Sequence, residues 1–181
     1  MILSILIPTV KRRKRLLDSL VWELQRQMQG KAVEIIIDED EKKTTGEKRN
    51  RLKARAKGEY IVFIDDDDQI YHEYISEILK GCESGADVIV FNGYMTTNGK
   101  NRVNFVIRLG EAYEMRNGVY YRYPNHLCAF KRSLVKDIHF PNVSKREDFI
   151  WSAKVKDSDV LKTQYIIEKD LYHYRFLTHK Y

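Results

Sequence analysis

The chain has 181 residues, of which 43% are hydrophobic and 32% are charged, as in an ordinary globular domain with its own core. No apolar run approaches the roughly 20 residues of a membrane span, and the apolar start precedes the basic residues, the reverse of a signal peptide. Cys82 and Cys128 form no CxxC pair, which argues against a zinc site or a disulfide framework. The formal charge of +6 favours anionic partners. We therefore expect a cytoplasmic protein.

The first half of the chain alternates between strand and helix patterns. Apolar residues at helical spacing from Leu16 to Met28 predict a helix that ends at Gly30. Thr44 and Glu47 have the spacing of a capping box and predict the start of another helix. In chain order, the expected elements are strand 3–10, helix 16–28, strand 33–37, helix 44–57, strand 60–64, helix 71–79 and strand 87–91. This alternation predicts a mainly parallel sheet flanked by helices.

The second half has a different pattern. The pairs Asn98-Gly99 and Asn117-Gly118 are strong signals for β-hairpin turns, and the residues between them alternate as in a half-buried strand. A helix is expected over 147–156 and a last strand over 164–176. We therefore expect one domain over 1–181, in which residues 1–95 bind a nucleotide and residues 96–181 form a mixed β-hairpin half that shapes a second site.

The most informative feature is a run of four aspartates, Asp65 to Asp68, directly after the apolar run 60–64. In open α/β sheets, ligands bind at the carboxyl ends of the strands. Carboxylate oxygens suit hard cations such as Mg²⁺ or Mn²⁺, and like charges this close repel unless positive charge lies among them. A solvated acidic turn is the plain alternative, but a turn needs only one or two aspartates. The run predicts a metal site.

Several blocks together resemble the family 2 glycosyltransferases of the GT-A fold. The resemblance covers nearly the whole chain, and its specific part is the central block Gly46 to Asp68, which contains Arg49-Asn50, seven further residues and Gly-Glu-Tyr before the aspartates. The flanking matches are Ile7-Pro8-Thr9, Asp38-Glu39-Asp40, Glu147-Asp148 and Tyr172-His173-Tyr174-Arg175. The segment 123–127 is also similar to small transferases encoded by tailed phages, so the compartment is expected to be a bacterial or phage-infected cytoplasm.

The resemblance implies a nucleotide-sugar donor, which we expect to be a UDP-sugar, and a divalent cation, Mn²⁺ or Mg²⁺, at a DXD-type motif. Asp67 is the implied direct metal ligand, and Asp65 is implied to hold the ribose or a metal-bound water. His173 is a further candidate for a metal or phosphate contact, although lone histidines are more often packed or exposed. The residues implied to bind the donor are Pro8, Thr9, Asp38, Asp40, Arg49, Asn50, Asp65 and Asp66. Either Asp38 or Asp40 is a candidate to hold the base.

The resemblance also assigns the chemistry. Attack by an acceptor hydroxyl needs a general base, and Asp148 matches the base of the family, with Glu147 as its support. A single displacement inverts the anomeric centre. From sequence alone, the favoured role of these two acids is to stabilise a helix N-terminus, and the resemblance reverses that order.

Two other classes of function compete with this one. A non-catalytic module that binds nucleic acid would use the basic residues of the helix over 44–57 against phosphates, but these residues point all around that helix. A metal-dependent nuclease or nucleotidyltransferase would use the aspartates without explaining Arg49-Asn50 or Glu147-Asp148. We expect a saccharide or glycoconjugate acceptor first, and a modified base in DNA second.

Overall fold

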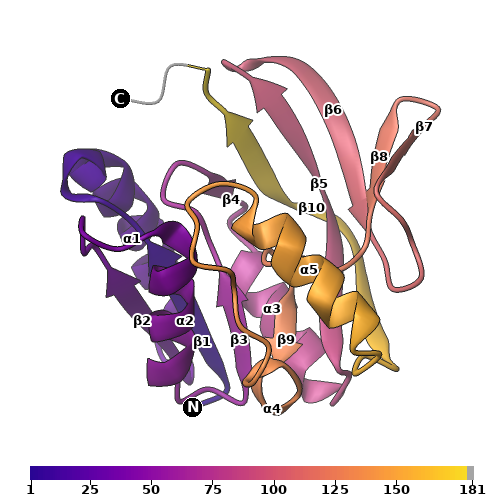
Figure 1. Ribbon diagram of the computed structural model, residues 1–181, viewed down its shortest axis with the longest axis horizontal. Coiled ribbons are helices and arrows are strands. Elements are labelled where there is room, and N and C mark those ends of the chain that lie inside the picture. Colours follow the sequence, from indigo (N-terminus) through magenta and orange to yellow (C-terminus); the bar gives the residue numbers. More distant parts are fainter. Residues whose placement is uncertain (179–181) are drawn as a thin grey trace.

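The computed structural model describes residues 1–178. Its strands are β1 (Leu3–Pro8), β2 (Val33–Asp38), β3 (Tyr60–Phe63), β4 (Gln69–Ile70), β5 (Val88–Thr97), β6 (Lys100–Ile107), β7 (Glu114–Arg116), β8 (Val119–Arg122), β9 (Ala129–Lys131) and β10 (Gln164–Phe176). The helices are η1 (Lys11–Arg13), α1 (Lys14–Met28), α2 (Thr45–Arg55), α3 (Tyr74–Glu83), α4 (Arg132–Val135) and α5 (Glu147–Asp157). Within the described range, the strands form one sheet in the order β2-β1-β3-β9-β5-β6-β8-β7, and β10 pairs with β5 and β4 (Figure 1).

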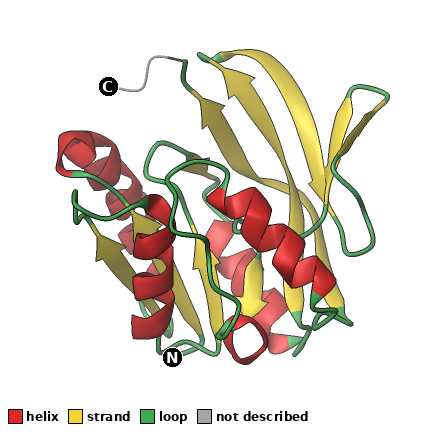
Figure 2. Ribbon diagram, in the orientation of Figure 1, coloured by secondary structure: helices red, strands yellow, loops and turns green. Residues whose placement is uncertain are grey.

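The first three long strands form the parallel part of the sheet. β1 pairs in parallel with β2 on one side and with β3 on the other, so the carboxyl ends of all three strands meet at one edge. All residues of β1 and β3 are buried, as expected for strands that are covered on both faces. Helices lie on both faces of the sheet, with α1 beside α3 and α2 beside α5 (Figure 2). This arrangement confirms the predicted α/β fold.

Local sequence signals account for the helix starts and the hairpin turns. Thr44 and Glu47 form a complete capping box at the start of α2. Asn98 and Gly99 adopt φ of 49° and 75° between β5 and β6, and Asn117 and Gly118 adopt φ of 49° and 76° between β7 and β8. Two consecutive residues with positive φ are the requirement of a type I′ turn, and Asn-Gly meets it at low steric cost. Both predicted hairpins are confirmed.

Some elements differ from the prediction. β5 continues past the expected end at Phe91 to Thr97, because its second part pairs with β6 on one edge and with β10 on the other. The short strand β9 was not predicted, and it lies antiparallel between β3 and β5. Three residues with no alternation give no strand signal, so only the two neighbouring strands define β9.

The core fixes the position of α5. Trp151 is fully buried, lies parallel to Phe140 with ring centroids 4.6 Å apart, and meets Phe130 edge-on at 5.2 Å. Its indole Nε1 donates to the carbonyl of Ile138 at 2.9 Å. Trp151 therefore anchors the helix that carries Glu147 and Asp148. Among residues 1–178, no helix is both long and apolar enough to cross a membrane.

Candidate active site

The predicted donor residues gather where the three parallel strands end. Thr9 follows β1, Asp38 ends β2, and the aspartates follow β3. The backbone N–H of Thr9 donates to the carbonyl of Asp38 at 2.9 Å, and Pro8 lies opposite Asp38 in the register. The ammonium group of Lys48, from α2, donates to the carbonyl of Thr9 at 2.6 Å. The parallel topology therefore brings these distant segments to one edge.

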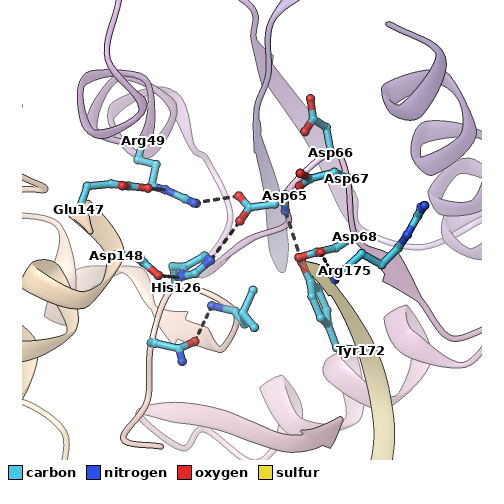
Figure 3. A network of polar contacts seen from close by, with 12 residues as sticks. Arg49, Asp65, Asp66, Asp67, Asp68, His126, Glu147, Asp148, Tyr172 and Arg175 are labelled. Atoms are coloured by element: carbon cyan, nitrogen blue, oxygen red, sulfur yellow. Dashed lines mark hydrogen bonds and ion pairs between the residues drawn. The ribbon is translucent and has the colours of Figure 1, made fainter. Parts of the chain in front are cut away.

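Asp65 and Glu147 meet through Arg49. The guanidinium of Arg49 lies 2.8 Å from Asp65 and 3.4 Å from Glu147, and its side chain is almost fully buried (Figure 3). It also lies over the rings of Phe63 and Phe140, 5.2 and 5.7 Å from their centroids. Burial disfavours the charge on Asp65, but Arg49 and His126 outweigh it and hold the pKa of this carboxyl well below its usual range. Asp65 is therefore ionised at neutral pH.

Asp66 and Asp67 share the side chain of Arg13. One guanidinium nitrogen lies 2.6 Å from Asp66, and the other lies 3.3 Å from Asp67. Thr9 donates its hydroxyl to Asp66. Burial raises the pKa of Asp66 although Thr9 and Arg13 oppose the shift. Sequence reasoning did not single out Arg13, but the need for positive charge among the aspartates, together with the basic turn 11–15, was the signal for it.

Asp68 has a different environment from the other three aspartates. It is buried, accepts the phenol of Tyr172 at 2.8 Å, and accepts the backbone N–H of Arg175 at 2.7 Å. Burial, with the charges of Asp65 and Asp67 added, raises the pKa of Asp68 well above its usual range. Asp68 thus attaches the acidic run to β10, and the Tyr-x-Tyr-Arg block provides both of its partners.

His126 lies between Asp65, which follows β3, and Asp148, at the start of α5. Its Nε2 is 3.4 Å from Asp65, and its Nδ1 is 3.5 Å from Asp148 (Figure 3). The Asp148 side chain is 40% exposed, whereas Glu147 is turned inward to Arg49. The sequence gives no signal for this arrangement, because Asp65 and Asp148 lie far from His126 along the chain.

Asp38 and Asp40 both contact Arg51. The guanidinium lies 3.2 Å from the buried Asp38 and 2.8 Å from the more exposed Asp40. These acids line a cavity of about 440 Å³ at the end of β2, which Lys11, Lys42 and Arg55 also line. Both candidates for base binding, Asp38 and Asp40, line this cavity, so the choice between them stays open.

Two predicted residues have protein partners on every polar atom of their side chains. The amide of Asn50 donates to the carbonyl of Phe140 and accepts its N–H, both at 2.9 Å, so it fastens the segment before α5 to α2. His173 contacts Thr96 at 2.8 Å and Gln69 at 3.0 Å, and it stacks on Tyr94 at 4.3 Å. A ligand role for either residue requires the exchange of one of these contacts.

The basic side chains of α2 do not form one exposed stripe. Lys48, Arg49 and Lys53 are buried, and Lys53 donates to the carbonyls of Val135 and Ile138. Arg51 is engaged by Asp38 and Asp40. Most of the cations that a nucleic-acid-binding module would use are therefore committed to the protein itself.

The acidic run supplies the oxygen ligands that a hard cation prefers, although the described side chains are not already arranged as a metal site. Among the described residues, no group of three or more His, Cys, Asp or Glu side chains is arranged to hold a metal ion. The donors are nevertheless all carboxylate oxygens, and Asp66 and Asp67 already share a cationic group, that of Arg13. This shared cation shows that positive charge fits between them.

A second cavity of about 560 Å³ borders the acidic run. Asp66 and Asp68 reach it, and α1 forms one wall with Leu20 and Trp22. The opposite wall comes from β5 and β10 and includes Tyr94, His173 and Arg175. The two halves of the molecule thus meet at this cavity.

The parallel strands, the acidic run after β3 and the long antiparallel extension together define a GT-A-like α/β protein. The sequence model described as Glycosyl transferase family 2 matches residues 37–140, more than half of the chain. The chain therefore belongs to glycosyl transferase family 2, a family of glycosyltransferase enzymes. The match includes Asp38 and the acidic run, and it ends before Glu147 and Asp148. The resemblance drawn from the motifs is confirmed.

Solved structures of S. aureus TarS are similar in fold. TarS 1–349 in complex with UDP has a TM-score of 0.69 at 16% identity, covering 97% of this chain and 60% of that one. TarS 1–349 in complex with UDP-GlcNAc has a TM-score of 0.70 at 15% identity, covering 99% and 60%. The chain thus spans about 60% of the length of TarS 1–349. A search of the curated proteins found no match.

Proposed function

We propose that the chain transfers a sugar from a nucleotide-sugar donor, a UDP-sugar, to a hydroxyl of a saccharide or glycoconjugate, with inversion and with help from Mg²⁺ or Mn²⁺. The observation that carries this proposal is the convergence of Asp65, at the end of β3, and Asp148, at the start of α5, on the single side chain of His126. The UDP and UDP-GlcNAc complexes of TarS support the choice of donor.

The donor would bind across the ends of the parallel strands. Thr9 and Pro8 lie beside Asp38, and the 440 Å³ cavity next to them has a size suited to a base and ribose. Lys11 and Arg55 at this cavity supply positive charge for phosphates. Arg49 is buried against Asp65, so its contribution would be to keep that carboxylate ionised and oriented.

Asp67 and Asp65 are the residues that we propose to hold the divalent cation. A bound cation would supply charge neutralisation for the leaving diphosphate. The low pKa of Asp65, which Arg49 and His126 maintain against burial, supports its part as an ionised oxygen donor. We do not include His173 in this set, because both of its ring nitrogens already contact protein groups.

Asp148 is the proposed general base. Its partly exposed side chain can reach a hydroxyl that enters from solvent, whereas Glu147 faces the interior. In the transition state Asp148 would accept the proton of the attacking hydroxyl. Glu147 would act indirectly, because its contact with Arg49 fixes the first turn of α5.

Calorimetry with a panel of sugar nucleotides, with and without Mn²⁺, tests donor binding. We expect a UDP-sugar to bind in a metal-dependent manner in the wild type, and the metal dependence to disappear in Asp67→Asn. Asp18→Asn is the control, because Asp18 lies on the exposed face of α1 and contacts Lys14 only on the surface. Equal metal-dependent binding by wild type and Asp67→Asn would exclude Asp67 as the ligand.

A transfer assay then identifies the acceptor. Labelled donor is incubated with the enzyme, Mn²⁺ and either cell-envelope glycans or duplex DNA that contains hydroxymethylated bases. We expect label in the glycan fraction. Label in DNA alone would reverse this ranking.

A further inference from the structure

His126 lies between the proposed donor-binding residue Asp65 and the proposed base Asp148. Its ring is buried, and each of its nitrogens faces a carboxylate from a different part of the site. Within the described residues, neither nitrogen makes an aligned hydrogen bond, since the contacts to Asp65 and Asp148 are 3.4 and 3.5 Å long. Polar atoms buried in this way usually have a partner, so this arrangement requires an explanation.

Hydrogen bonds of the main chain fix the segment that carries His126. The carbonyl of His126 accepts the N–H of Phe63, the last residue of β3, at 3.2 Å. Asn125 closes the loop on the other side, because its side chain accepts the N–H of Leu127 at 3.1 Å and its carbonyl accepts that of Cys128 at 2.9 Å. The imidazole is thus attached to the same strand end that carries Asp65, while Asp148 comes from a helix anchored elsewhere.

We propose that His126 is a positioning residue that couples donor binding at Asp65 to the orientation of Asp148. The inference rests on the function proposed above. A neutral imidazole has one N–H and donates to only one of two carboxylates at a time. In the donor-free protein, Asp65 and Asp148 compete for that hydrogen. When a donor engages Asp65, the N–H is left to Asp148, which is then held facing the site.

The chain offers a matched pair of substitutions that separate the two contacts. An asparagine amide nitrogen takes approximately the place of Nδ1, and a glutamine amide nitrogen takes that of Nε2. His126→Asn therefore preserves the contact with Asp148, whereas His126→Gln preserves the contact with Asp65. A histidine that merely fills space would give variants with similar defects.

Steady-state kinetics and donor calorimetry on the two variants test the proposal. We expect His126→Gln to bind the donor more weakly, because its amide stays on Asp65 and competes with the donor, and to lose kcat by roughly tenfold to a hundredfold, the effect of removing the partner that orients Asp148. We expect His126→Asn to retain kcat more closely and to bind the donor at least as tightly as the wild type, because no contact with Asp65 has to be exchanged. The same loss of kcat and of donor affinity in both variants would overturn the proposal.

Nitrogen-15 NMR of the histidine rings gives a second measurement, which needs no turnover and no substitution at His126 itself. Asp148→Asn should shift the Nδ1 signal of His126, and addition of UDP-sugar to the wild type should shift both ring nitrogens. Ring signals that do not respond to either change would overturn the coupling in an enzyme that is otherwise active. A wild type that binds no sugar nucleotide and transfers no sugar would instead overturn the proposed function, and the coupling with it.

Discussion

Arg49 determines the division of roles between the two acids at the start of α5. It is buried between Asp65 and Glu147, and the removal of one partner from a buried ion pair typically costs about 3–5 kcal/mol. Glu147 is therefore committed to structure. Asp148, the next residue, has a side chain that is 40% exposed and is the one that we propose as the base.

Asp148→Asn should retain donor binding and lose transfer. The substitution keeps the size of the side chain but removes the proton acceptor, so kcat should fall roughly a hundredfold or more while the donor affinity stays near that of the wild type. Asp157→Asn, at the exposed other end of α5, is the control. Turnover close to wild type in Asp148→Asn would return Glu147 and Asp148 to the role of helix stabilisers.

Lys53 predicts a pH dependence of stability. Burial lowers the pKa of its ammonium group to about 8, against roughly 10.4 in an unfolded chain. Below pH 8 the ammonium group is charged in both states. Between pH 8 and about 10.4 the unfolded chain holds a proton that the folded chain has lost, so the free energy of unfolding gains a contribution that rises with pH.

The comparison with Lys53→Met isolates this contribution from other titrating groups. Relative to the variant, the wild type should gain roughly 1–3 kcal/mol in the free energy of unfolding between pH 8 and 10.4, as measured by urea denaturation. The exposed Lys57→Met is the control. A difference between wild type and Lys53→Met that stays constant over this range would show that Lys53 is charged throughout.

At the scale of elements, the start of α2 is set by its contact with the segment before α5. A Cβ on Gly46 would lie 1.8 Å from the carbonyl oxygen of Pro141, a clash that only a movement of backbone atoms can relieve. The N–H of Gly46 also donates to Val143 at 3.0 Å. Glycine at this position therefore permits the approach of α2 to the chain that leads to Glu147 and Asp148.

Gly46→Ala tests this contact against helix propensity. Alanine is favoured over glycine in helices by about 1 kcal/mol, but the steric overlap should dominate and destabilise the protein by more than about 1 kcal/mol. Thermal unfolding measures the net effect. Ala54→Gly, on the exposed face of α2, is the control for propensity alone and should cost about 1 kcal/mol. Stabilisation by Gly46→Ala would show that the 141–143 segment moves freely.

The elements with local signals were predictable, and the contacts between them were not. The capping box at Thr44 and the Asn-Gly turns depend on neighbours in sequence, so they could be identified without the fold. The partners of the aspartates could not, because Arg13, His126 and Tyr172 reach them from separate segments. Asn50, a motif residue expected at the donor, contacts the backbone of Phe140, and no signal in the sequence indicated that contact either.

At the scale of the molecule, both cysteines report on unfolding. Burial raises the pKa of Cys82 and of Cys128 to about 12, so neither thiol is ionised in the folded state at pH 8, where an exposed thiol with a pKa near 8.5 is partly reactive. We expect a thiol reagent at pH 8 to label both cysteines rapidly in urea and very slowly in native buffer. A small thiol compound is the control for reagent quality, and fast labelling of the native protein would contradict the burial of these residues.

The attachment of Asp68 to β10 has a consequence for how the protein is made. The two groups that satisfy this buried carboxyl, the phenol of Tyr172 and the N–H of Arg175, follow it by 104 and 107 residues. During synthesis the chain emerges at roughly 5–20 residues per second, so Asp68 leaves the ribosome several seconds before its partners. The strand end that we propose to bind the donor therefore matures late, and a nascent chain that stops short of β10 should expose an incompletely paired acidic turn to chaperones.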